Sequence, residues 1–495
     1  MEAKRMIKVK PLDWEEAWAL FQVKVECIDH DILPVSRNVA KECRGLPITL
    51  ITIGRAMANR NTVEEWEHAL EVLRSSASSL QGMEDEVFQD VEVEAFARLM
   101  FSYDSLHSDK VKSCFLYCSL FPEDFQILKD DLVHYWISES FCAHNEVYFI
   151  IGSLVGACLL EEKGRLVKMH DVIRDMTMWI ACKCEKEKHK FFVKASAQLI
   201  EVPEVGLWEG SEQSSLMANS LKRINETPTC PDLLTLFLSH NRRLCKISNG
   251  FFQFMHTLTV LDLSNTGVEE LPVGISKLNS WQYLNLSRTY IGQLPVQLKM
   301  STSSQHLWFA NMKNLAILHI FCKSHSKGLG VDVVMEETET HNVAGGLGIS
   351  ISRETCFNSL HTLILLGNFR LRDLTWLILA PNLMLLRVFN NKHIEEIISV
   401  EKLDDFRVGV ENLNLFSKLE VLELEALPEL KSIYPKALSF LFLEKMEVYR
   451  CPKLKKLPLN SSSAIGCKFV IKAQDHFLKN VEWDDDSTKT IFCPV

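Results

Sequence analysis

The chain has 495 residues, of which 47% are hydrophobic and 24% are charged. This composition is typical of a globular protein with a sizeable core, and the length suits about three domains of roughly 150 residues each. Acidic residues outnumber basic ones and give a formal net charge of −10. A nucleic-acid partner is therefore not expected, because phosphate backbones select basic surfaces.

The beginning of the chain and its cysteines both point to the cytosol. The first residues, MEAKRMIKVKPLDWEE, contain no apolar run, so we expect no secretory signal. The 15 cysteines are an odd number and show neither a disulfide framework nor the paired spacing of a zinc site. They fit free thiols in a reducing compartment.

Residues 1–85 are predicted to form a helical domain. Asp13, followed by acidic residues, is placed to begin a first helix at residue 14. A second helix is predicted from Val35 to Ala58, and within it Gly45 and Pro47 interrupt the apolar pattern and are expected to force a break or a kink. Thr62 and Glu65 match a capping box, which places the start of a further helix at residue 63.

Residues 86–195 form a second predicted domain. VKSCFLYCSLFPEDF indicates an apolar helix stopped by Pro122. The run from Tyr148 to Leu160 has 13 residues, too few to span a membrane, and is predicted to be a buried helix. A strand, a turn at Lys163 and Gly164, a second strand and a final helix follow. Helices followed by a small hairpin are the outline of a winged-helix domain.

A leucine pattern dominates residues 231–495. Leu258-x-x-Leu261-x-Leu263 recurs 23 residues later as Trp281-x-x-Leu284-x-Leu286. Further copies begin at Leu233, Leu315, Leu360, Leu383, Leu419 and Leu443. These phrases predict a leucine-rich-repeat solenoid, an α/β horseshoe whose apolar residues stack inward. Residues 196–230 are taken as a linker and cap, residues 322–356 as an insertion, and the whole chain as an α+β multidomain protein.

The residue between the second and third core positions of each phrase is expected to face out of the sheet. These residues are Phe237, Asp262, Asn285, His319, Ile364, Arg387, Glu423 and Glu447. Such a mixture suits a protein partner better than a phosphate track. The alternative is that these side chains are merely solvated.

No catalytic motif is present, so we do not expect an enzyme. None of the 20 glycines is followed by lysine, which excludes the phosphate-binding pattern GxxxxGK[ST] within this sequence. GxGxxG, HExxH and GxSxG are also missing. His170 stands at the start of a predicted helix, where free N–H groups favour an anion. It either helps bind a phosphate, or it simply packs while Asp171 caps the helix.

Four stretches precede the repeats in a fixed order: MIKVKPLDWEEAWALF, CRGLPITLITIGRAM, VKSCFLYCSLFPEDF and KMHDVIRDMTMWIA. Together they resemble plant disease-resistance proteins of the coiled-coil, nucleotide-binding (NB-ARC) and leucine-rich-repeat family, over nearly the whole chain. The resemblance assigns residues 1–85 to the helical ARC subdomain and residues 86–195 to the winged helix. It implies a cytoplasmic immune receptor, sometimes held at the plasma membrane by partners, that ADP keeps closed and ATP opens to trigger defence and the hypersensitive response.

The resemblance also implies a partial nucleotide site. The family's GLPL motif corresponds to Gly45-Leu46-Pro47-Ile48, with Pro47 near the adenine, and its MHD motif to Met169-His170-Asp171, with His170 at the β-phosphate of ADP. The coiled coil and the phosphate loop lie upstream in the family, and we expect this chain to begin after them. ADP or ATP binding by this chain alone is therefore expected to be weak or absent.

The expected partners follow from the same resemblance. A pathogen effector or a guarded host protein is expected on the repeats, without nucleic acid and without a transmembrane segment. The alternatives are a nucleotide-independent interaction module, acting as decoy or regulator of a full-length receptor, and a non-functional truncated product.

Overall fold

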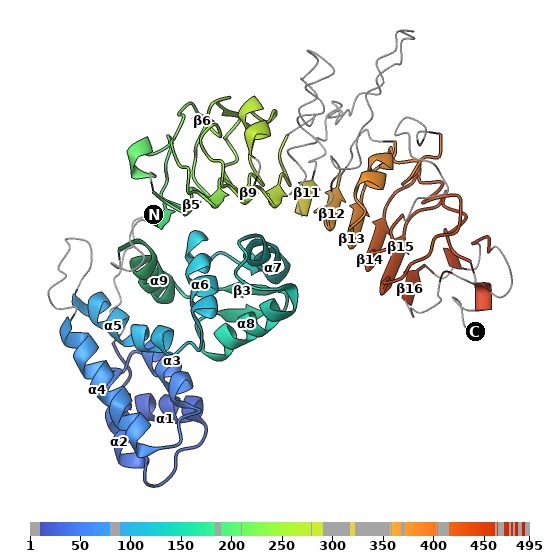
Figure 1. Ribbon diagram of the computed structural model, residues 1–495. Coiled ribbons are helices and arrows are strands. Elements are labelled where there is room, and N and C mark those ends of the chain that lie inside the picture. Colours follow the sequence, from blue (N-terminus) through green and yellow to red (C-terminus); the bar gives the residue numbers. More distant parts are fainter. Residues whose placement is uncertain are drawn as a thin grey trace, which may run out of the picture. The chain divides into compact units, whose positions relative to one another are not determined.

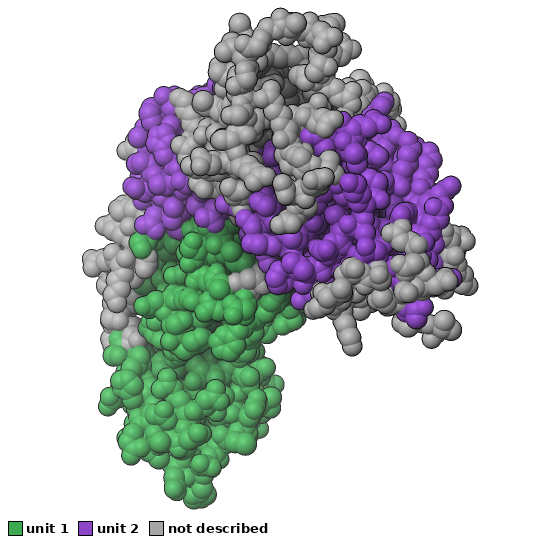
Figure 2. Space-filling view, turned by 45° about the vertical axis from the view of Figure 1, so that its right-hand side comes forward, with its two compact units in different colours: residues 1–193 green, residues 194–495 purple. Residues whose placement is uncertain are grey.

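The computed structural model divides the chain into two compact units, residues 1–193 and residues 194–495 (Figure 2). The structure describes residues 10–79, 90–183, 190–208, 210–278, 280–290, 317–321, 357, 359–367, 372–401, 403, 415–460, 463, 470–474, 477–478, 481–483 and 488–490. The predicted insertion at residues 322–356 lies outside these ranges. Among the helices described, none combines the length and apolar composition that crossing a membrane requires.

The first unit begins with helices that share one core. They are α1 (Trp14–Val25), α2 (Leu33–Glu42), α3 (Pro47–Met57), α4 (Val63–Ser79) and α5 (Asp90–Asp104). Phe21 of α1, Ile53 of α3, Trp66 of α4 and Phe101 of α5 all belong to this core. A buried aromatic side chain contributes about 3–5 kcal/mol to stability, measured as the cost of its removal, so these side chains hold the helices together.

The predicted helix starts are confirmed. The carboxylate of Asp13 accepts a hydrogen bond of 2.9 Å from the N–H of Glu16. Thr62 and Glu65 form the reciprocal capping box, with Thr62 N–H donating to Glu65 Oε2 at 3.2 Å and Glu65 N–H donating to Thr62 Oγ1 at 3.3 Å. The single helix predicted from Val35 to Ala58 is two helices, α2 and α3, and the interruption expected near Gly45 and Pro47 is the break between them.

The rest of the first unit combines helices with a small antiparallel sheet. Its elements are α6 (Asp109–Tyr117), the 3-10 turn η1 (Cys118–Leu120), β1 (Ile127–Leu128), α7 (Lys129–Ser138), α8 (His144–Gly156), β2 (Glu161–Lys163), β3 (Leu166–Lys168), α9 (Asp171–Lys183) and β4 (Phe191–Val193). Strand β3 lies between β1 and β2. The predicted order of helix, strand, turn, strand and helix is confirmed, and Gly164 takes a φ of +62° in the turn.

The prediction of a buried helix from Tyr148 to Leu160 is wrong in two respects. Helix α8 begins earlier, at His144, and ends at Gly156. One face is open, because Tyr148 is 52% exposed and Phe149 is 67% exposed. The apolar run is continuous in sequence, but a helix places consecutive residues on different faces, and only one face packs on the unit.

The second unit is built on one parallel sheet (Figure 1). Its strands pair in chain order: β5 (Gln213–Ser215), β7 (Thr235–Phe237), β9 (Val260–Asp262), β10 (Tyr283–Asn285), β11 (Ile317–Phe321), β12 (Thr362–Leu366), β13 (Leu385–Phe389), β14 (Val421–Glu425), β15 (Lys445–Tyr449) and β16 (Val470–Ala473). Strands β6 (Arg223–Ile224) and β8 (Lys246–Ile247) form a separate pair, and the 3-10 turns η2 (Val205–Leu207), η3 (Val273–Lys277) and η6 (Thr375–Leu379) lie between strands.

The eight predicted leucine phrases correspond to β7 and β9–β15. The central residue of each phrase pairs with the central residue of the next, as Leu261 does with Leu236 and with Leu284. Strands β5 and β16 were not predicted from the leucine pattern. In the coil of β5, Ser214 of the strand and Ser211 just before it occupy the core positions, and their hydroxyls lie 2.9 Å apart in a hydrogen bond. The solenoid predicted from the sequence is therefore present, with two additional strands.

The predicted exposure of the outward residues holds in only part of the sheet. Ile364, Arg387 and Glu447 are half-buried, whereas Phe237, Asp262, Asn285 and Glu423 are buried. Asp262 Oδ1 accepts a hydrogen bond of 2.7 Å from Ser264 N–H, and Asn285 Oδ1 accepts one of 3.0 Å from Ser287 N–H. These two polar side chains thus bond to the turn that follows their own strand rather than to water.

A left-handed residue follows the strand in most coils. Four positions after the central core residue, φ is positive at Ala218, His240, Asn265, Arg288, Gly367, Asn390, Ala426 and Arg450. The N–H of His240 donates to Ser264 O at 2.8 Å, and that of Ala426 donates to Tyr449 O at 2.9 Å. The left-handed conformation therefore turns the chain away from the sheet while it adds one more hydrogen bond to the next coil.

We expect Leu422→Ala to lower the free energy of unfolding of the second unit by about 2–5 kcal/mol, because it removes a fully buried stacked side chain. Val421→Ala, on the same strand but half-buried on the outward face, is the matched control and should cost under about 1 kcal/mol. Urea denaturation followed by circular dichroism measures both. Equal losses would contradict the assigned inward face of β14.

Candidate functional site

The turn at Gly45, Leu46 and Pro47 is shaped by its backbone. Gly45 has a φ of +71°, and a Cβ added there would lie 2.5 Å from the carbonyl oxygen of Leu12. The carbonyl of Gly45 accepts a hydrogen bond of 2.9 Å from Leu12 N–H. Pro47 then opens α3 at its first position, where its missing N–H is not needed. Leu46 is half-buried and Pro47 is exposed, so the turn presents an apolar surface to solvent.

Side chains from other segments fix this turn. Thr49 Oγ1 donates to the carbonyls of Cys43 and Leu46, at 3.0 Å and 2.8 Å. Arg98, from the middle of α5, is 1% exposed and donates to the carbonyl of Glu42 at the end of α2. A cation there stabilises the negative end of the helix dipole. Arg98 could not be predicted as part of this turn, because nothing in its local sequence links it to a residue 56 positions away.

Burial also protects a thiol beside the turn. Burial raises the pKa of Cys43 to about 12, although the nearby charge of Arg98 opposes this. The thiol therefore stays protonated at neutral pH and packs as a small apolar side chain.

His170 lies at the start of α9. Its carbonyl accepts the first helical hydrogen bond, from Arg174 N–H at 2.8 Å, which makes His170 the residue that caps the helix. Its Nδ1 accepts a hydrogen bond of 3.3 Å from Val172 N–H. Asp171, the residue expected to cap if His170 only packed, is instead the first helical residue. With Nδ1 accepting, the neutral imidazole carries its proton on Nε2 and has that N–H available as a donor.

The surroundings of His170 carry both signs of charge. Carboxylate oxygens of Glu123, Asp124 and Asp171 lie within 4.8 Å of one another, the first two exposed and the third half-buried. Lys168 contacts Asp124 at 3.3 Å and Glu161 at 3.5 Å. The hydrogen bond to Asp124, with the charge of Glu161, raises the pKa of Lys168. Asp171, the residue after His170, therefore belongs to a group of three carboxylates, and Lys168 is already paired with acids.

The predicted site residues lie at the starts of two helices of the first unit, α3 and α9. Helices α3 and α9 both pack against α5. Within the described ranges, no hydrogen bond or ion pair joins Leu46 or Pro47 to His170. The structure thus brings them onto one unit without a direct polar contact between them in the part of the chain that it describes.

A second candidate site is the outward face of β12–β15. Three columns of outward side chains run across these strands, half-buried except at Thr362 and Glu423, and five of the eight residues in the outer two columns are apolar or aromatic. Leu385 and Val421 are in one of these columns; Leu366, Phe389 and Tyr449 are in the other. This face therefore combines apolar area with aromatic anchors.

Ion pairs run down the middle column. Glu423, whose side chain is 10% exposed, lies 2.8 Å from Arg387 Nε and 2.9 Å from Lys445 Nζ. Lys445 also contacts Glu447 at 3.1 Å, and Glu447 contacts Lys472 at 3.7 Å. Partial burial by itself lowers the pKa of Lys445, but its hydrogen bonds to Glu423 and Glu447 outweigh this and raise it. The charges on this face thus neutralise one another.

Comparisons with known proteins agree with the repeat architecture. The family model of the leucine-rich repeats of RPS2-like plant disease resistance proteins matches residues 347–464, and a general leucine-rich-repeat model matches residues 231–291. Disease resistance protein RPS5 of Arabidopsis thaliana is 38% identical over 99% of this chain and 64% of its own length. Probable disease resistance protein At1g61300 of the same plant is 34% identical over 98% of this chain and 74% of its own length.

The aligned region covers only part of each of these relatives. This chain spans 64–65% of the length of the first curated relatives it matches. Among solved structures, a leucine-rich-repeat protein of Leptospira interrogans aligns with a TM-score of 0.31 and 21% identity over 58% of this chain and 63% of its own.

Gly45→Ala should lower the free energy of unfolding of the first unit by at least about 2 kcal/mol, because the left-handed backbone and the Leu12 carbonyl both exclude a Cβ. Gly152→Ala is the matched control. It lies in α8 with nothing within 4 Å of the added atom and should raise stability by up to about 1 kcal/mol. Thermal unfolding compares the two variants. An unchanged stability of Gly45→Ala would contradict the explanation given for the turn.

Proposed function

Because the chain belongs to the family of plant disease resistance proteins with leucine-rich repeats, we propose that it acts in plant disease resistance by binding a partner protein on the outward face of β12–β15. The observation that carries this proposal is the set of half-buried apolar and aromatic side chains on strands in strict register. Such a surface offers large contact area at little entropic cost, because the sheet already holds each side chain in place. The partner is a pathogen effector or a guarded host protein.

The first unit is proposed to be the C-terminal part of an NB-ARC module. In this proposal α1–α4 are the helical ARC subdomain, and α6–α9 with the sheet β1-β3-β2 are the winged helix. Leu46 and Pro47 would contact an adenine, and the Nε2–H of His170 would donate to a phosphate. What supports these roles is that Pro47 is exposed and that the capping hydrogen bond leaves Nε2 as the donor.

Nucleotide binding by this chain alone is proposed to be weak or absent, and no ATP hydrolysis is proposed. No glycine in the sequence is followed by lysine, so the sequence does not supply the phosphate-binding loop. The carboxylates beside His170 further oppose a polyphosphate. A cytoplasmic location, with attachment to the plasma membrane through partners, completes the proposal.

The same observations favour a second candidate function. The chain would serve as a nucleotide-independent interaction module that regulates a full-length receptor. Both candidates use the repeat face, and they differ in whether His170 ever meets ADP.

Calorimetric titration with ADP distinguishes the two candidate functions. We expect the purified chain to release no ADP on denaturation, and titration with ADP to show a Kd weaker than about 1 mM. Co-purified ADP, or saturable binding that His170→Ala abolishes, would exclude the nucleotide-independent candidate. His170→Asn is the control, because asparagine restores a helix cap without the imidazole.

The partner face is tested by a double variant, Phe389→Ala with Tyr449→Ala. Plant proteins that co-purify with the wild-type chain should be reduced at least tenfold, because aromatic anchors dominate interface energies. Phe254→Ala, which removes an aromatic side chain that is 38% exposed elsewhere in the second unit, is the matched control and should leave them unchanged. Quantitative mass spectrometry provides the measurement. Identical protein sets for all three chains would place the partner surface elsewhere.

A further inference from the structure

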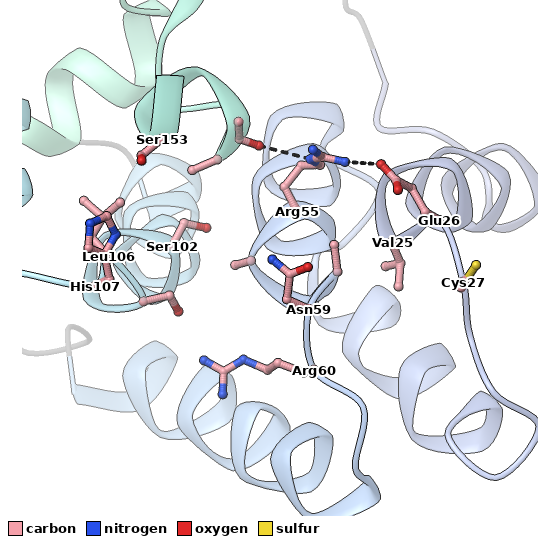
Figure 3. A pocket seen from close by; sticks show the side chains of 15 residues that line it. Val25, Glu26, Cys27, Arg55, Asn59, Arg60, Ser102, Leu106, His107 and Ser153 are labelled. Carbon is pink, nitrogen blue, oxygen red and sulfur yellow. Dashed lines mark hydrogen bonds and ion pairs between the residues drawn. The ribbon is translucent and has the colours of Figure 1, made fainter. Parts of the chain in front are cut away.

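A cavity of about 540 Å³ opens in the first unit where three helices end (Figure 3). It is lined by the C-terminal parts of α3, α5 and α8 and by the end of α1. Many of the lining side chains are small, among them Ala56, Ser105 and Ala157, which is why the space exists. The volume lies in the usual range for small-molecule sites, roughly 300–1,000 Å³. None of Leu46, Pro47 and His170 lines this cavity, so it is separate from the proposed nucleotide contacts.

One charge on its wall is already neutralised. Arg55 lies 2.5 Å from Glu26 Oε1 and donates through Nε to the carbonyl of Gly156 at 3.0 Å. Figure 3 shows this pair along one side of the opening. Arg55 therefore ties α1, α3 and the end of α8 together and closes that side, and it leaves no net charge there.

A second arginine is not neutralised in this way. The guanidinium of Arg60 lies 5.8 Å from the ring centre of Phe101, and it forms no ion pair within 4 Å with any described acid. Its backbone is fixed, because the carbonyl of Arg60 accepts a hydrogen bond of 2.9 Å from Trp66 Nε1. The wall thus holds a positioned cation whose five N–H donors suit an oxyanion.

A buried hydroxyl faces the same space. Ser102 is 2% exposed, and its Oγ finds no hydrogen-bond partner among the residues that the structure describes. An orphaned buried hydroxyl is unfavourable, and a serine in a helix normally avoids this by bonding to the preceding turn. In Figure 3 Ser102 and Asn59 extend toward one another across the cavity. Ser102 is therefore poised to bond to a ligand.

We propose that this cavity binds a small molecule through an oxyanion, a phosphate or a carboxylate group, held between Arg60 and Ser102. Arg60 supplies the charge, the hydroxyl of Ser102 donates one hydrogen bond, and the amide of Asn59 lies at the mouth. The proposal does not rest on the nucleotide roles of Pro47 and His170. Ligand binding here would join α3, α5 and α8 and so couple the two halves of the first unit.

The test uses the full chain and two probes, inorganic phosphate and citrate, in isothermal titration against chloride at equal ionic strength. We expect saturable binding of at least one probe, which also tells phosphate from carboxylate. Arg60→Gln should weaken it at least about tenfold, since charge-assisted hydrogen bonds contribute about 1.5–3 kcal/mol. Arg165→Gln, at an exposed arginine paired with Asp130, is the matched control and should bind as the wild type does.

Ser102→Ala gives a second readout that does not depend on the folding of Arg60→Gln. It should weaken binding about two- to tenfold, yet raise the melting temperature of the unliganded chain, because it removes an unpaired buried hydroxyl. The proposal is overturned if neither probe binds, if Arg60→Gln and the wild type bind equally, or if His170→Ala abolishes binding while Arg60→Gln does not. The last outcome would assign the anion to His170.

Discussion

The second unit depends on one backbone hydrogen bond repeated from coil to coil. At the end of a strand the chain must turn away from the sheet while its N–H groups keep hydrogen-bond partners. A residue in the left-handed conformation meets both requirements. In this conformation the N–H of Ala218, His240 or Asn265 still reaches the carbonyl of the next coil. The left-handed region costs roughly 1–2 kcal/mol for a residue with a side chain. The structure accepts that cost repeatedly because an unpaired buried N–H is as unfavourable.

Buried polar side chains complete the same turns. The amide of Asn241 donates to the carbonyls of Leu216 and Leu238, both at 2.8 Å. The hydroxyls of Thr266 and Thr289 donate to Leu263 and Leu286, also at 2.8 Å. The stacked leucines supply the apolar driving force, while these side chains satisfy the carbonyls that the curved backbone leaves over. Packing and polar satisfaction thus repeat with one period.

Much of this architecture could be predicted from local patterns. The leucine phrases defined the strands, and the residues around Asp13 and Thr62 defined helix starts, because periodicity and capping are properties of neighbouring residues. Strand β5 was not predicted, because Ser211 and Ser214 take the places of leucines and their hydroxyls form a hydrogen bond with each other. The exposed face of α8 was not predicted, because a continuous apolar run does not indicate which face of the helix packs against the rest of the unit.

The geometry of the candidate sites could be predicted from the sequence to a smaller extent, because it depends on tertiary contacts. Gly45 and Pro47 marked a turn, but the contact that forbids a Cβ comes from Leu12, and the cation that caps α2 comes from Arg98. At His170 the sequence left two interpretations open, and the geometry shows an imidazole that caps its own helix. The cavity between Arg60 and Ser102 was not predicted, because it is assembled from segments about 40 residues apart, each unremarkable by itself.

The register of the sheet is independent of how much chain lies between strands. Leu261 and Leu284 pair across neighbouring strands after a short connection, while Leu284 and Leu318 pair just as directly after a longer one. A gene encoding such an array is tolerant of unequal insertion and deletion, provided that each strand and its left-handed turn survive. Selection can therefore lengthen or rewrite the connections, and change the shape of the surface, without changing the fold.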